Sequence, residues 1–124
     1  MALTQSEAVA TLVMEMGFAD GDYSDQEIES VVYNNPVYLK YQQNIDHDLF
    51  LQKIKRGETT KQAAVSTLKN RSLDTQLNAL ACVWHCLLAD GKMTEGEKSL
   101  MVELLVDFDI HIDDVTARLK KITS

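Results

Sequence analysis

The sequence predicts a single all-α domain that spans residues 1–124. Apolar residues recur at helical spacing through most of the chain, and no segment keeps a strand-like alternation for long. The chain is 45% hydrophobic and 25% charged, a composition typical of a globular protein with a packed core. A length of 124 residues suits one domain. At the usual helix lengths we expect roughly six to eight helices.

The first third of the chain is expected to contain two helices and a short third one. Apolar spacing places the first helix at about residues 5–19. Ser24 opens the second helix, which ends before Pro36 because the residue that precedes a proline is disfavoured in a helix. Residues 37–45 are rich in aromatic side chains and are expected to form a short helix.

The middle of the chain carries clear helix start and stop signals. Asp46 is a predicted N-cap, and Gly57 ends the helix that follows it. The stretch "TTKQAAVSTLKN" predicts a further helix, which starts at either Thr59 or Thr60.

The most apolar helix is expected to begin at Ser72 or Asp74. It is hydrophobic nearly all round, so we expect it to be the buried central helix, with Cys82 and Cys86 as reduced, buried thiols. Two amphipathic helices follow, one with apolar residues between positions 100 and 108 and one between positions 112 and 122.

A short acidic turn is written twice in the sequence. "FADGDYSDQE" at residues 18–27 is followed by "LADGKMTEGE" at residues 88–97, at a constant offset of 70 positions. Each copy lies between two predicted helices, so residues 5–33 and 74–108 read as an internal repeat. We therefore expect two helical hairpins that are related by a pseudo-two-fold axis within one domain.

Most residues of the two turns have a structural explanation. The glycine of each turn follows an apolar helix, where a left-handed residue often ends the helix. Ser24–Glu27 and Thr94–Glu97 each follow the S/T-x-x-E pattern of a capping box at the start of the next helix.

The aspartates of the turns are less easily explained. Asp20 and Asp90 lie at the negative end of a helix, where a carboxylate is disfavoured by roughly 0.3–1 kcal/mol. Their side chains either accept hydrogen bonds from the following turn or help to bind a divalent cation such as Ca²⁺, Mg²⁺ or Mn²⁺. The candidate metal ligands are Asp20, Asp22 and Glu27 in the first turn and Asp90 and Glu97 in the second.

An EF-hand does not account for these turns. If Asp20 is the first loop position, the sixth is Asp25 rather than glycine and the twelfth is Val31 rather than glutamate. The second copy places Lys92 where the first has Asp22, so the two turns are not expected to bind a cation equally.

The twice-written pattern A-D-G-x-x-S/T-x-x-E resembles the TerB-like family, which is associated with tellurite resistance. "ADGDYSDQE" and "ADGKMTEGE" carry the resemblance, and the helical layout matches over most of the chain. The resemblance implies an all-helical domain with acidic residues that bind divalent metal. It also implies a role in tellurite resistance or a related stress response, in a complex near the cytoplasmic membrane surface.

The other metal-ligating or nucleophilic side chains favour structural roles. Cys82 and His85 are too few to form a zinc site. His47 follows a predicted N-cap, and His111 stands in an acidic stretch; neither pattern supports a designed metal site. The sequence contains no nucleophile elbow, phosphate-binding loop or HExxH motif, so we expect no enzymatic activity. A hydrolytic metal site would require the two acidic turns to meet.

Two functions therefore remain open. The first is a TerB-like module that binds a divalent metal; the second is a helical protein-interaction domain whose acidic turns are only caps, with Tyr38, Tyr41 or Phe50 as candidate partner contacts. The net charge of −7 argues against nucleic-acid binding. Because neither a signal peptide nor a membrane span is recognisable, the sequence predicts a cytoplasmic protein with unidentified protein partners.

Overall fold

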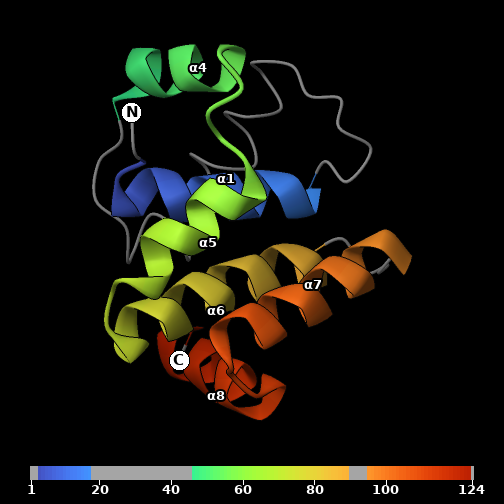
Figure 1. The fold of residues 1–124 in the computed structure, drawn as a ribbon. Helices are drawn as coiled ribbons and strands as arrows, with labels where there is room; N and C mark the ends of the chain where they lie inside the picture. The colour runs from blue at the N-terminus through green and yellow to red at the C-terminus, as the bar shows by residue number, and fades with distance from the viewer. Residues whose placement is uncertain (1–2, 18–45, 90–94, 124) are drawn as a thin grey trace.

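The computed structural model describes residues 3–17, 46–89 and 95–123, and within these ranges the chain forms helices and no strand. The described helices are α1 (Gln5–Gly17), α4 (His47–Lys55), α5 (Lys61–Lys69), α6 (Leu73–Ala89), α7 (Glu95–Phe108) and α8 (Ile112–Thr123) (Figure 1). The all-α prediction is confirmed. The helices expected after Ser24 and at residues 37–45 lie outside the described residues.

Both predicted ends of α4 are confirmed. The Asp46 carboxylate accepts a hydrogen bond from the Leu49 N–H at 3.1 Å, which makes Asp46 the N-cap. Gly57 has a φ of +72° directly after the helix, and its N–H donates to the Ile54 carbonyl at 3.0 Å. Such a left-handed residue satisfies carbonyls that would otherwise lack a partner at the helix end.

The two starts that the sequence left open are now assigned. The Thr60 hydroxyl accepts a hydrogen bond from the Ala63 N–H at 3.1 Å, so the second of the two threonines caps α5. The Ser72 hydroxyl accepts from the Thr75 N–H at 3.2 Å, so Ser72 rather than Asp74 caps α6.

Among the described helices, α1 is the most deeply buried. Every side chain from residue 6 to residue 14 is buried, because α1 packs against α5 and α6 and also contacts α7. α6 is fully buried at residues 79–83 but exposes 61% of Leu73 and 51% of Leu88 near its ends. The prediction that α6 is the one buried central helix is therefore wrong. α1 shares that place with α6, whose far side carries α8 (Figure 1).

A buried ion pair joins α1 to α4. Lys53 Nζ lies 2.7 Å from Glu7 Oε1, and both side chains are only 4% exposed. Glu7 also closes a capping box at the start of α1: Thr4 N–H donates to Glu7 Oε1 at 2.9 Å, and Glu7 N–H donates to Thr4 Oγ1 at 3.2 Å. This pair is not predictable from a local sequence pattern, because its two residues are 46 positions apart.

Glu7 is held in its ionised form by these partners. Burial raises the pKa of Glu7, but the hydrogen bonds from Lys53 and Thr4 outweigh burial and leave the pKa below the ordinary value of 4.5. A carboxyl group whose pKa is lowered by folding stabilises the folded state at pH values above its ordinary pKa. That contribution is lost as the pH falls through the folded-state pKa.

Phe50 is not the exposed partner contact that the sequence suggested. Its side chain is 0% exposed and belongs to the hydrophobic core. Phe50 lies three residues before Lys53, so both side chains project from the inner face of α4. Tyr38 and Tyr41, the other two residues of that expectation, lie outside the described residues.

Candidate functional site

The predicted metal ligands fall largely outside the described residues. Asp20, Asp22, Glu27 and Asp90 lie outside them, whereas Glu97 is in the first turn of α7 and is 8% exposed. Within the described ranges, no group of three or more histidine, cysteine, aspartate or glutamate side chains could hold a metal ion. The metal site at the two acidic turns stays a prediction.

The cysteine and histidine candidates have structural settings. Cys82 is completely buried in α6, and burial raises the pKa of its thiol to about 12, so the thiol stays protonated and unreactive near neutral pH. His85 is half-buried in the same helix. Asp46, which precedes His47, is the N-cap of α4 as the sequence predicted, and Asp48, which follows it, lies in the first turn of that helix.

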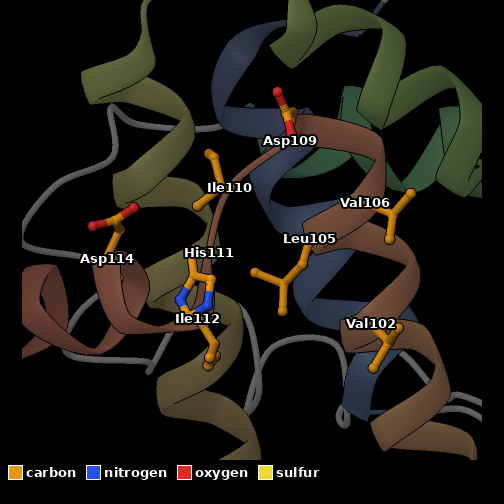
Figure 2. A pocket seen from close by; sticks show the side chains of 8 residues that line it. All are labelled: Val102, Leu105, Val106, Asp109, Ile110, His111, Ile112 and Asp114. Carbon is orange, nitrogen blue, oxygen red and sulfur yellow. The ribbon is translucent and has the colours of Figure 1, made fainter.

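The surface between the last two helices forms a groove of about 580 Å³, which we call the α7–α8 groove. Its apolar lining is mostly aliphatic, and its only charged residues are two aspartates (Figure 2). The lining residues are Val102, Leu105, Val106, Asp109, Ile110, His111, Ile112 and Asp114. Val102 is 59% exposed and Val106 74% exposed, so together they add apolar surface beside the groove.

The groove exists because α7 carries more apolar residues than one face can bury. Met101, Leu104 and Phe108 point into the core. Val102 and Val106 are four residues apart and so lie one turn apart on another face of the helix. Sequence reasoning counted the core-facing stripe and overlooked these two valines. The signal that could have found them is this second apolar pair at a spacing of four.

The floor of the groove is a Schellman motif at the end of α7. Ile110 N–H donates to the Leu105 carbonyl at 3.0 Å, and Asp109 N–H donates to the Val106 carbonyl at 3.1 Å. Asp109 occupies the left-handed position with a φ of +53°, where glycine is the usual residue. The motif brings Ile110 against the groove beside Leu105.

The opposite wall is the start of α8. His111 caps this helix through its ring, because Nδ1 accepts a hydrogen bond from the Asp113 N–H at 3.1 Å. The same Nδ1 lies 3.4 Å from Asp113 Oδ2, so the ring contacts both the backbone and the side chain of Asp113. Ile112 is half-buried directly after this cap, and Asp114 N–H donates to the His111 carbonyl at 3.0 Å.

The charge on the groove is negative. Asp109 and Asp114 line it, Asp113 is exposed beside them, and no lysine or arginine is among the lining residues. Neither Asp109 nor Asp114 forms an ion pair within the parts of the chain that the structure describes.

Two acidic residues on the α5 side of α7 share one lysine. Lys61 Nζ lies 2.9 Å from Glu103 Oε2 and 3.2 Å from Asp107 Oδ2. Partial burial lowers the pKa of Lys61, but the two carboxylates outweigh this effect and raise it, so Lys61 stays charged. Lys61 therefore offsets part of the negative charge on that side of α7, whereas neither aspartate that lines the groove has an ion-pair partner among the described residues.

Comparisons with known proteins leave the function to be argued from the chain itself. None of the described helices combines the length and apolar character needed to cross a bilayer. No protein-family model, curated protein or solved structure matches this sequence or its fold.

Proposed function

We propose that this chain is a non-enzymatic interaction domain that binds another protein in the α7–α8 groove. The observation that carries the proposal is the exposure of Val102 and Val106, at 59% and 74%, beside a groove of about 580 Å³. Contiguous exposed apolar surface with a polar rim is typical of a protein-binding site. Leu105 and Ile112 are half-buried at the same place and extend the apolar surface inward.

The form of the groove suits a helical ligand. Val102, Leu105 and Val106 follow the i, i+3, i+4 spacing along α7, and Ile112 faces them from α8. A second helix laid along this surface could insert its own apolar side chains between those of α7 and α8. The polar groups of the groove are mostly engaged in the Schellman motif and the His111 cap, an arrangement that serves helix ends rather than catalysis.

The double substitution Val102→Ser/Val106→Ser tests this function. We expect it to weaken binding of helical ligands, selected from a displayed peptide library against the native protein, by at least about tenfold. The reason is the loss of two exposed methyl-bearing anchors without any change in charge. Peptide affinity is measured by fluorescence anisotropy, and the binding site is located from backbone amide chemical shifts of residues 102–114.

The matched control is Leu73→Ser/Leu88→Ser, which removes two exposed apolar side chains from α6, outside the groove. This variant should bind the selected peptides as the native protein does. Circular dichroism should show that both variants stay folded. Equal binding by both variants, with amide shifts elsewhere on the molecule, would refute an interaction site in the groove.

A second candidate function is divalent-metal binding at the two acidic turns, as the resemblance to the TerB-like family implies. The duplicated pattern, with Asp20 and Glu27 repeated as Asp90 and Glu97, favours it. Glu97 is buried in the first turn of α7, so its carboxylate is directed away from bulk solvent. In this function the metal would couple to protein association in a cytoplasmic stress response, in a complex at the membrane surface.

Thermal unfolding with and without Ca²⁺, Mg²⁺ or Mn²⁺ tests the metal function. We expect at least one of these ions to raise the melting temperature of the native protein, because a ligand that binds only the folded state stabilises it. The rise should disappear in Asp20→Ala/Asp90→Ala and persist in Asp46→Ala/Asp74→Ala, which removes two aspartates elsewhere. Calorimetry that detects no ion uptake would rule this function out.

A further inference from the structure

The charge and shape of the α7–α8 groove identify the kind of partner that it fits. We infer that its occupant is a cationic amphipathic helix of another protein; this inference rests on the interaction function proposed above. The apolar face of that helix would pack on Val102, Leu105, Val106 and Ile112. Lysine or arginine side chains on its flanks would pair with Asp109 and Asp114.

The apolar part of the match follows from the geometry of α7. From Val102 to Asp109 the helix rises by about 10 Å, or two turns. A partner helix with apolar residues at i, i+3, i+4 and i+7 presents a stripe of the same length. The aliphatic side chains along α7 and those of Ile110 and Ile112 border the same depression (Figure 2).

The negative charge of the groove favours a cationic helix as its partner. Two aspartates line the groove and Asp113 lies beside them, whereas no basic residue lines it. The N-terminus of α8 offsets about half a unit charge, which is less than the charge of the two first-turn aspartates of that helix, Asp113 and Asp114. Surfaces of one sign steer ligands of the opposite sign and repel those of the same sign.

The position and backbone conformation of Asp109 are locally unfavourable in free energy. A non-glycine residue with a φ of +53° is disfavoured, and a carboxylate just beyond a helix C-terminus is repelled by the helix dipole. Asp109 forms no ion pair within the described residues that would offset these costs. A cationic side chain from a partner would do so.

The same charges disfavour other occupants. A second copy of this chain, docked groove to groove, would bring Asp109 and Asp114 of each copy against those of the other. Each copy also carries a net charge of −7. Nucleic acids and anionic membrane surfaces are repelled for the same reason.

The probe for this inference is a pair of synthetic helical peptides of about 18 residues, long enough to cover the groove. Both carry leucine at i, i+3, i+4 and i+7; one has lysine at the flanking positions and the other glutamate. We expect the lysine peptide to bind at least about tenfold more tightly in 0.1 M salt and to lose this advantage as salt rises. Amide chemical shifts should place it on residues 102–114.

Two charge variants distinguish the effect of the groove aspartates on peptide binding from the effect of the net negative charge of the chain. Asp109→Asn/Asp114→Asn is expected to weaken binding of the lysine peptide by about threefold to tenfold, as exposed ion pairs contribute modestly. Asparagine tolerates the left-handed conformation of position 109, so the fold should be unchanged. Asp48→Asn/Glu95→Gln makes the same change in net charge at the first turns of α4 and α7 and should leave binding unchanged.

Each alternative result has a distinct meaning. Equal affinity for the lysine and glutamate peptides, with binding still lost in Val102→Ser/Val106→Ser, overturns the cationic partner and leaves the interaction function standing. Self-association in sedimentation that is lost in the same valine variant also overturns it, in favour of a second copy. If neither peptide shifts residues 102–114 and the valine variant changes nothing, both the inference and the proposed function fail.

Discussion

Replacing Lys53 with methionine is expected to destabilise the fold by about 3–5 kcal/mol. The substitution keeps the length and apolar stem of the side chain but removes the ammonium group that lies 2.7 Å from Glu7 Oε1. The Glu7 carboxylate would then remain 4% exposed with no counterion among the described residues. Removing one partner of a buried ion pair costs far more than removing one partner of an exposed pair. Because a small domain is stabilised by about 5–15 kcal/mol, this change is a large part of the total.

Urea unfolding measures the loss of stability, and two further variants test its cause. Lys55→Met removes an exposed lysine from the same helix and should change the free energy of unfolding by no more than about 0.5 kcal/mol. Glu7→Gln/Lys53→Met should be more stable than Lys53→Met, since no charge is left buried and the amide can still accept from Thr4 N–H.

The cost of Lys53→Met should also depend on pH. The pKa of Glu7 lies below 4.5 in the native protein, so the pair contributes at neutral pH and loses its contribution in acid. The difference in stability between the native protein and Lys53→Met should therefore narrow as the pH falls through the ordinary carboxyl pKa of 4.5 and below it. A loss of less than 1 kcal/mol at pH 7, or a difference that does not change with pH, would contradict a stabilising buried pair.

Replacing Phe50 with alanine is expected to cost about 3–5 kcal/mol of stability, because the ring is 0% exposed and its removal leaves a cavity as well as lost apolar burial. Phe50 and Lys53 both project inward from α4, so the substitution tests whether this helix belongs to the core. Thermal or urea unfolding measures the effect, which should appear as a lower midpoint with a similar denaturant dependence.

The surface control for this substitution is Val106→Ala, which truncates a side chain that is 74% exposed and should change stability by no more than about 0.5 kcal/mol. The effects on peptide affinity should be reversed. Folded Phe50→Ala should bind the selected peptides as the native protein does, whereas Val106→Ala should bind them more weakly. If Phe50→Ala kept full stability and lost peptide binding, Phe50 would be the partner contact that the sequence first suggested.

The parts of the fold that sequence reasoning predicted correctly depend on neighbouring residues. Asp46 and Gly57 bound α4 as predicted, because a cap is formed by hydrogen bonds over three or four positions. For the same reason, the sequence narrowed the N-caps of α5 and α6 to two residues each, and Thr60 and Ser72 were among them. Local rules place a helix start within a residue or two, but only the hydrogen bond selects the residue.

The residues that sequence reasoning missed depend on packing between distant segments. Glu7 and Lys53 each look like an ordinary helix surface charge until α4 is placed against α1. Val102 and Val106 look like core residues until α7 is seen to bury its other face. Helical periodicity says which residues share a face, but it does not say which face meets a neighbouring helix.

Of the two candidate sites, one is recognisable from local sequence and the other only from the packing of helices. The duplicated acidic turns, with Asp20 and Asp90 at helix ends, are visible in the sequence alone because their pattern is local and repeated. The α7–α8 groove is not, because it combines a stripe of α7, the left-handed Asp109 and the His111 cap of α8.

By itself, the sequence determined the all-helical class, both ends of α4, the starts of α5 and α6 to within two residues, and the acidic character of the chain. These properties follow from backbone hydrogen bonding, side-chain capping and composition, which act over a few residues or over the whole chain. The tertiary structure alone decided that α1 is buried on all sides, that Phe50 and Lys53 face inward, and that two valines of α7 stay exposed. Burial is a property of how helices pack together, so these outcomes depend on contacts between distant parts of the chain.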